Sequence, residues 1–518
     1  MMNAYFDQSA RVLAGMEKMA DLIGSTMGPK GRSVTFCGGD KAKTTNDGIR
    51  IAENYLPDGE LEREGARRLV DAARATVKRA GDGTSLTVML GYCMYERAIE
   101  RVAAGEDAIG VARDLRSGAE ATISNLRRSA LSEVSRPLFE SVGRVAMKGD
   151  ALGAEIGGMV FDLGPDGVLM PEMAGVGEEK TTLSMEDGFR SSARMPEKMY
   201  GGAARVKLDN AMCVFSKTAV GGNVNGAHWG RIFAEWQRRC EEAGGLIPLV
   251  VVAPDVEGSV NATFMARNNN GVPIPLYIIR VDAEAAADMA IFVGGHAFSA
   301  ADGVLLENYG TSQMFFDPIP NCDLYVGQDF VVARARHPER HASLTDLVAR
   351  LTVAKDSVKD AATAEAISKR LAALQGKIGV IRVHALTETG LGDFSERIED
   401  AYRASRSVWN HGVLPGGGAA LVMAAAGDFA VYAKGVARVI WGNAGFSAEE
   451  IEKALSDLKG GEALALGIDG YTNKRAICKM KQDSCDVYDS ALVIEEAIKN
   501  AVDVIAPLIE TKYFLCHD

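Results

Sequence analysis

The chain has 518 residues, of which 47% are hydrophobic, and its formal net charge is −12. This length predicts about three or four domains with ample apolar core, and the composition excludes a disordered chain. The acidic balance excludes a basic footprint for nucleic acid, so we expect no nucleic-acid partner. No apolar run approaches the roughly 20 residues that span a bilayer, so we expect no membrane partner and a cytoplasmic location.

The N-terminal segment predicts a helix followed by two glycine-containing corners. Apolar residues recur at helical spacing from Leu13 to Met27, and Gly28-Pro29-Lys30-Gly31 ends that pattern. Residues 33–36 then have the composition of a strand. The loop between them is not a Walker A loop, because no GxxxxGK[ST] pattern occurs in the chain. The second corner, Asn46-Asp47-Gly48, would by itself be a hairpin turn.

The run Gly81-Asp82-Gly83-Thr84-Ser85 separates two longer helical patterns, Leu61 to Ala80 and Leu86 to Ala104. Its glycines would let the backbone approach a ligand, and Thr84 and Ser85 would cap the second helix, whose free N–H groups attract an anion. Asp82 could then hold a hard cation such as Mg²⁺ between phosphate oxygens. Taken alone, the pentapeptide favours an ordinary helix–turn–helix corner.

Several segments taken together resemble the group I chaperonins, the GroEL-like family. They occur in the family's order and extend over nearly the whole chain: residues 26–32, 46–48, 81–85, 248–258 (PLVVVAPDVEG), 397–401 (RIEDA) and 412–420 (GVLPGGGAA). The resemblance implies a multidomain α+β and α/β fold. Its parts would be a mainly helical equatorial domain, a small intermediate domain and an α/β apical domain.

The resemblance also implies the domain boundaries. The equatorial domain would comprise residues 1–131 and 411–518, the intermediate domain 132–187 and 379–410, and the apical domain 188–378. Strand and helix patterns alternate in the middle of the chain, where Leu249 to Ala253 and Leu276 to Val281 are candidate buried strands. That alternation predicts a βαβ-type unit with a right-handed crossover.

The resemblance implies an ATP site with Mg²⁺, and K⁺ is a further candidate cation. Asp400 would orient the attacking water and Asp47 would support hydrolysis, while Asp82 would bind the metal ion. The implied nucleotide-binding residues are Thr26, Met27, Gly28, Pro29, Asp82, Gly83, Thr84, Ser85, Leu86, Gly417 and Asp489. Without the family context, RIEDA fits an ordinary solvated helix face, which is the alternative for Asp400.

Three departures from the family pattern bear on this site. Leu86 stands where the family usually has a third Thr, Asn46 stands where it has Lys, and Val145-Ala146 replaces a polar pair. None of them removes a carboxylate. We therefore expect hydrolysis to survive with an altered rate or cation dependence.

In the family, two apical helices carry apolar residues that bind non-native polypeptide. The residues of this chain that would inherit the role are Tyr200, Ile232, Phe233, Trp236, Phe264, Met265 and Ala266. Without the resemblance, the narrow apolar stripe from Ile232 to Trp236 favours packing onto the sheet. Asn261 occupies a position that is apolar in the family, which predicts a more polar groove.

The prediction is an ATPase that acts as an ATP-dependent protein-folding chaperonin. It would form a homo-oligomeric ring, seven-membered by family analogy, with non-native polypeptide clients and a co-chaperonin lid as candidate partners. The alternative is a ring-forming, ATP-binding scaffold or holdase without productive folding. A small-molecule kinase is weaker, because no Arg- or His-containing constellation supplies an acceptor site. A phage-encoded chain would act in the host cytoplasm.

Overall fold

The computed structural model describes most of the chain. It leaves out residues 1, 29, 37–42, 46, 56, 133–134, 166, 174–179, 196–205, 222–226, 259–274, 313, 315–317, 328, 337–341, 359, 385–387, 458–464, 470–473, 479–486 and 515–518. The described residues form two compact units, one of residues 1–183 and 381–518 and one of residues 184–380. The chain leaves the first unit along β4 (Thr182–Asp187) and returns along β11 (Lys377–Val383).

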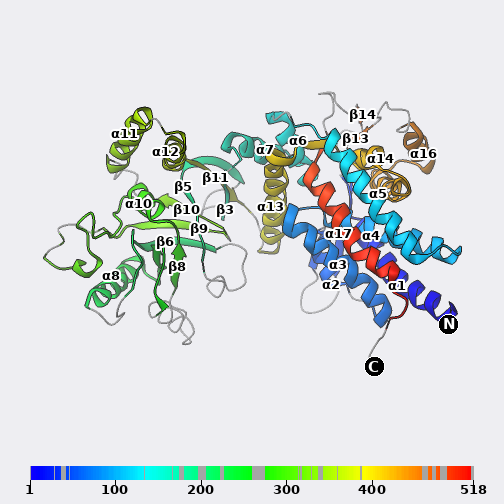
Figure 1. The fold of residues 1–518 in the computed structure, drawn as a ribbon, viewed down its shortest axis with the longest axis horizontal. Coiled ribbons are helices and arrows are strands. Elements are labelled where there is room, and N and C mark those ends of the chain that lie inside the picture. Colours follow the sequence, from blue (N-terminus) through cyan, green and yellow to red (C-terminus); the bar gives the residue numbers. More distant parts are fainter. Residues whose placement is uncertain are drawn as a thin grey trace. The chain divides into compact units, whose positions relative to one another are not determined.

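The first unit is built mainly from long helices that pack side by side (Figure 1). The helix α17, near the C-terminus of the chain, packs against α3, α4 and α5, and α1 packs against α3 and α4. The bounds of these helices are α1 Met2–Gly24, α3 Glu60–Ala80, α4 Thr84–Ala103, α5 Ala108–Ser129 and α17 Ala491–Glu510. The predicted helical patterns therefore form the core of this unit. Helices α3 and α4 start and end within two residues of the expected bounds, whereas α1 begins at Met2, well before Leu13, the first residue of its predicted pattern.

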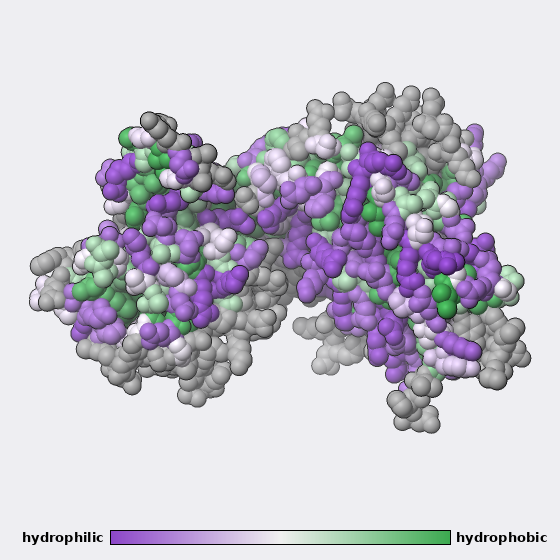
Figure 2. Space-filling view, viewed as in Figure 1, coloured by the Kyte–Doolittle hydropathy of each residue, from purple (hydrophilic) through white to green (hydrophobic). Residues whose placement is uncertain are grey.

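Helix α3 shows how the sequence pattern places a helix in this bundle. Its residues Leu69 and Ala73 are fully buried, whereas the neighbouring Arg67, Arg68 and Arg74 are exposed. Hydrophilic residues accordingly cover the face of α3 seen in Figure 2. An apolar stripe on one side and a charged surface on the other hold the helix at the edge of the core.

A second apolar cluster of the first unit lies around α6 (Arg136–Ala146), α7 (Ala151–Leu163) and α13 (Glu388–His411). The rings of Phe139 and Phe161 pack against Trp409, with the Phe161 and Trp409 rings stacked at 5.7 Å. This cluster fixes α13, the helix that carries Asp400, against α6 and α7. The division of this unit into equatorial and intermediate domains stays a prediction.

The first unit contains further elements, most of them short. They are β1 Val34–Phe36, β2 Lys43–Thr45, α2 Gly48–Asn54, β3 Leu169–Met173, β12 Val413–Pro415, α14 Ala419–Ala424, α15 Phe429–Asn443, α16 Ala448–Asp457, β13 Ala465–Asp469, β14 Lys474–Cys478 and β15 Tyr488–Ser490. Two antiparallel pairs lie beside corners that the sequence singled out. The pair β1–β2 precedes α2, and β12 pairs with β15, so that Leu414 lies opposite Asp489.

The second unit contains a six-stranded sheet of order β5-β10-β9-β6-β7-β8 (Figure 1). Strands β6, β7 and β8 are parallel neighbours, whereas β5, β10 and β9 add antiparallel pairs. Every residue of β7 is buried, which explains its continuous apolar run. The bounds are β5 Phe189–Ser192, β6 Val206–Phe215, α8 Ala227–Ala243, β7 Leu249–Ala253, β8 Leu276–Arg280, α10 Ala283–Phe292, β9 Asn321–Val326, β10 Phe330–Ala335, α11 Ala342–Ser357 and α12 Ala361–Leu374.

The parallel part of this sheet confirms the strands expected from the sequence. Strand β7 spans the predicted residues Leu249–Ala253, and β8 ends at Arg280, one residue before the predicted end. Helix α8 connects the parallel strands β6 and β7, as a βαβ unit requires. The predicted α+β and α/β architecture is therefore present. Among the described residues, no helix is long and apolar enough to cross a lipid bilayer.

Candidate functional site

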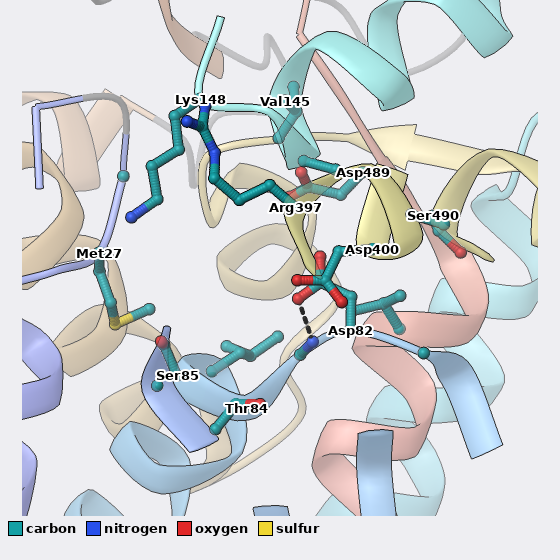
Figure 3. A pocket seen from close by; sticks show the side chains of 18 of the residues that line it. Met27, Asp82, Thr84, Ser85, Val145, Lys148, Arg397, Asp400, Asp489 and Ser490 are labelled. Carbon is teal, nitrogen blue, oxygen red and sulfur yellow. Dashed lines mark hydrogen bonds between the residues drawn. The ribbon is translucent and has the colours of Figure 1, made fainter. Parts of the chain in front are cut away.

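A cavity of about 660 Å³ opens in the first unit, where segments far apart in the sequence meet (Figure 3). Its walls come from the loop after α1, the start of α2, the α3–α4 loop and the turn after α6. Helix α13, the glycine turn before α14 and strand β15 complete the wall. The cavity thus gathers nearly all the corners that the sequence singled out in this unit.

The α3–α4 loop turns sharply because two of its residues adopt left-handed backbone conformations. Gly81 ends α3 with φ 81°, and Gly83 precedes α4 with φ 101°. Gly83, with no side chain, is the N-cap of α4, so the expectation that Thr84 and Ser85 cap this helix is wrong: α4 begins at Thr84. No side chain therefore caps the first N–H groups of α4, which can donate hydrogen bonds to a ligand at the positive end of the helix dipole.

A buried polar network supports this loop from below. The hydroxyl oxygen of Thr87 lies 2.9 Å from the carbonyl oxygen of Gly83 and 2.9 Å from the hydroxyl oxygen of Thr76. Asn500 of α17 donates to Thr76 Oγ1 over 3.1 Å. The three side chains are almost completely buried, which makes their mutual hydrogen bonds costly to break. The sequence pattern gave no signal for this network, because its members come from three different helices.

Asp47 begins α2 and brings the second corner against the α3–α4 loop. Its carboxylate accepts a hydrogen bond of 3.0 Å from the N–H of Ile49, so the Asp-Gly corner is a helix start and not a hairpin turn. A Cβ atom at Gly48 would lie 2.8 Å from Ser85 Oγ. A side chain at position 48 would therefore force Ser85 or Thr84 to shift.

Asp400 reaches the same cavity from α13, and in Figure 3 its carboxylate lies beside that of Asp82. Burial, together with the Asp82 and Asp47 carboxylates, raises the pKa of Asp400 to about 9. Burial also raises the pKa of Asp82, although the Gly83 N–H donates to its carboxylate and opposes the rise. Like charges crowd in a poorly hydrated place, so the carboxylates cannot all ionise without added positive charge.

Asp489 and the glycine turn at 416–418 form another part of the cavity wall. Burial raises the pKa of Asp489 to about 6, with Asp82 acting in the same direction and a hydrogen bond from the Gly417 N–H opposing it. The indole N–H of Trp441 donates to the Gly417 carbonyl over 3.0 Å, which fixes the turn from α15. Trp441 is fully buried and was missed by the sequence reasoning, since nothing in its neighbourhood marks it as a supporting residue.

Among the basic residues that line the cavity, Lys148 and Arg397 were given no role by the sequence reasoning. Lys148 Nζ donates to the carbonyl oxygen of Thr26 over 3.2 Å, and the Arg397 guanidinium donates to the carbonyl of Met147 over 2.7 Å. Neither makes an ion pair with a described carboxylate. Burial lowers the pKa of Lys148 to about 8, with Arg397 acting in the same direction and the Asp82, Asp47 and Asp400 carboxylates opposing it.

The residues of the cavity fit a magnesium ion that is bound together with phosphate oxygens. Within the described part of the chain, no group of three or more His, Cys, Asp or Glu side chains could hold a metal ion alone. Mg²⁺ does not need such a cage, because it usually binds one or two carboxylates, several waters and substrate phosphates. A divalent cation at Asp82 would also relieve the repulsion that raises the pKa values of its neighbours.

Comparison with known proteins agrees with this arrangement. The sequence profile of the TCP-1/cpn60 chaperonin family matches residues 19–162, the segment that carries the α1, α2 and α3–α4 corners. The RuBisCO large subunit-binding protein subunit alpha of Brassica napus is 29% identical over 440 residues, which cover 80% of this chain and 76% of that protein. The chain is thus similar to chaperonins of the TCP-1/cpn60 family.

Two further comparisons also cover most of the chain. The chaperonin 60 subunit alpha 1 of Arabidopsis thaliana is 28% identical, with coverage of 80% of this chain and 70% of that protein. The crystal structure of the chaperonin gp146 from the bacteriophage EL 2 (Pseudomonas aeruginosa), determined in the presence of ATP-BeFx, matches with a TM-score of 0.56. It is 18% identical and covers 98% of this chain and 97% of that chain, so it supports the chaperonin fold.

Most residues that the chaperonin resemblance assigned to nucleotide binding or to catalysis line this cavity. They are Thr26, Met27, Gly28, Asp47, Asp82, Gly83, Thr84, Ser85, Leu86, Asp400, Gly417 and Asp489. Pro29 and Asn46 lie outside the described residues. The functions of the residues that meet here stay predictions.

The residues assigned to polypeptide binding are placed differently. Tyr200, Asn261, Phe264, Met265 and Ala266 lie outside the described residues. Ile232 and Trp236, on α8, are 0% and 9% exposed, and the Trp236 indole donates to the Ile247 carbonyl over 2.8 Å. Phe233 is half-buried and packs against the same core. The burial of Ile232 and Trp236 fits the alternative in which this stripe packs onto the sheet.

Proposed function

We propose that this protein is a chaperonin that binds ATP in the cavity of the first unit and hydrolyses it with Mg²⁺, as a ring that acts on non-native polypeptide. The observation that carries the proposal is the meeting of three carboxylates, Asp47, Asp82 and Asp400, with the free N-terminus of α4. Helix N–H groups favour phosphate, and hard carboxylates favour the magnesium ion that accompanies it. This combination matches the needs of phosphoryl transfer.

The reaction is a displacement at the terminal phosphorus atom. The oxygen of a water molecule forms a bond to that atom, the bond to the bridging oxygen breaks, and ADP leaves with the electron pair. Positive charge bound at Asp82 would lower the raised pKa of Asp400, so that the ionised carboxylate could orient the water and receive its proton. Asp47 would support it from the start of α2. Asp82 would hold Mg²⁺, which neutralises charge on the phosphate oxygens. The backbone N–H groups of Thr84 and Ser85 orient the phosphates, and Asp489 and Gly417 would contact the sugar.

A steady-state ATPase assay with the purified assembly and Mg²⁺ tests this proposal. Asp400→Asn keeps the shape of the side chain and should lower turnover about a hundredfold or more, because a positioned proton acceptor is lost. The control Asp71→Asn changes an exposed carboxylate of α3 outside the cavity and should leave turnover unchanged. Nucleotide affinity and particle size are measured on the same samples. Equal turnover in the two variants would remove Asp400 from the mechanism.

One observation keeps a second candidate function open, a ring-forming ATP-binding scaffold or holdase. Ile232 and Trp236 have little surface to offer to a client in this conformation. Refolding of a chemically denatured enzyme, with and without ATP, separates the two functions. Recovery of enzyme activity that depends on ATP supports the folding chaperonin, whereas suppression of aggregation without recovery supports the holdase.

A further inference from the structure

The turn after α6 carries a lysine where the backbone would favour glycine. Lys148 has φ 53° and is one of two non-glycine residues with positive φ in the described chain. The Lys148 N–H bonds to the Val145 carbonyl over 2.9 Å, and the following Gly149 N–H bonds to Arg144. Helices commonly end in such a turn, usually with glycine at the left-handed position, because a Cβ atom there costs about 1 kcal/mol or more. A side chain retained at that cost is a candidate for function.

The side chain of Lys148 extends from this turn into the cavity (Figure 3). Its ammonium group uses one donor for the Thr26 carbonyl at 3.2 Å, which leaves two donors. It also lies within electrostatic range of Asp82, Asp47 and Asp400, yet no described carboxylate is within ion-pair distance of it. The ammonium group is therefore poised beside the carboxylates without being neutralised by them.

A triphosphate in the cavity would complete this arrangement. Its oxygens can accept the two remaining hydrogen bonds of Lys148, and a lysine acts on phosphate as a compact point charge. A free monovalent cation such as K⁺ would seek the same surroundings, namely a backbone carbonyl oxygen beside phosphate oxygens. At the Thr26 carbonyl, the tethered ammonium already occupies that position and would repel a second cation.

We propose that Lys148 binds the phosphates of the nucleotide directly and takes the place of a free monovalent cation, so that ATP hydrolysis needs no K⁺. This inference rests on the proposed function. It adds a binding residue on the turn between α6 and α7 (Ala151–Leu163), and it links that turn through the nucleotide to the loop after α1. It also removes K⁺, the further candidate cation named from the sequence, from the cations that hydrolysis needs, and keeps Mg²⁺.

The variant Lys148→Gly tests the proposal without disturbing the fold, because glycine adopts this backbone conformation without strain. The control Lys78→Ala removes an exposed lysine of α3 that lies outside the cavity. ATP, ADP and AMP affinities are measured by displacement of a fluorescent nucleotide, and turnover is measured with K⁺, Na⁺ or tetramethylammonium as the only monovalent cation. Thermal unfolding verifies that both variants are folded.

We expect the unsubstituted protein to turn over at rates within about twofold in all three salts. Lys148→Gly should bind ATP at least tenfold more weakly and AMP nearly normally, and K⁺ or ammonium ions should restore much of its turnover. Strict K⁺ dependence of the unsubstituted protein, or unchanged ATP affinity and no cation rescue in Lys148→Gly, would overturn the proposal. If the unsubstituted protein binds ATP without hydrolysing it, the proposed ATPase function fails, and the ATP and AMP affinities still decide the role of Lys148.

Discussion

Gly83 is the residue on which the α3–α4 loop depends most directly, and Gly83→Ala tests that dependence. Its φ of 101° is unfavourable for any residue with a Cβ atom, which costs about 1–2 kcal/mol. The new methyl group would also lie 2.9 Å from Val493 Cγ1 and 3.1 Å from Thr76 Cγ2. Overpacking of this kind adds about 1–3 kcal/mol. The free energy of unfolding should therefore fall by about 2–5 kcal/mol.

Gly105 offers a matched control, because its φ is 100° and a Cβ atom there would meet nothing within 4 Å. Gly105→Ala should show the backbone strain alone, about 1–2 kcal/mol. Thermal and denaturant unfolding measure both variants, and fluorescent-nucleotide binding reports on the cavity. We expect Gly83→Ala to be the less stable variant and to lose at least tenfold in nucleotide affinity, since it moves the N-terminus of α4. Equal stability of the two variants, with normal nucleotide binding, would refute the packing argument.

Two further predictions concern the supports of the bundle. Thr87→Val removes a buried hydroxyl that binds Gly83 and Thr76, and it should lower the free energy of unfolding by about 1–3 kcal/mol in denaturant titrations; a change within experimental error would contradict the network. Hydrogen bonds from Arg127, and then Lys499, lower the pKa of Glu495 to about 2. That stabilisation is complete above pH 4.5 and is lost as the pH falls toward 2, so Glu495→Gln should cost about 1 kcal/mol at pH 7 after allowance for solvent screening, and less near pH 3. A pH-independent difference in melting temperature would contradict this assignment.

The helices and buried strands could be predicted because their signals are local. Leu249–Ala253 is a short, fully apolar run that can only be buried, and the structure makes it the strand β7. The pattern around Leu69 and Ala73 likewise defines the buried face of α3. In both cases the residues that decide the structure are neighbours in the sequence or lie one helical turn apart.

The supports of the site could not be predicted, because they depend on contacts between distant segments. The indole of Trp441 binds the Gly417 carbonyl across 24 positions, and Asn500 reaches Thr76 across 424. Lys148 lies in a turn that no sequence motif marked as part of the site, and its backbone is left-handed. For Ile232 and Trp236 the local signal was present but insufficient. Helical periodicity identifies their apolar face, but it does not show whether the sheet or a client polypeptide covers that face.

The charges of the cavity argue that its polar groups are arranged for a ligand and not for the stability of the empty protein. Arg403 and Glu399 lie on the cavity wall and form an ion pair at 2.6 Å, so close pairing is attainable there. Lys148 and Arg397 make no such pair with a described carboxylate, while Asp400 and Asp82 keep raised pKa values beside them. Buried cations without ion-pair partners, next to crowded carboxylates, are energetically unfavourable in the empty cavity. The arrangement becomes favourable when a polyanion binds the cations and a divalent cation binds the carboxylates. A magnesium nucleotide supplies both charges at once.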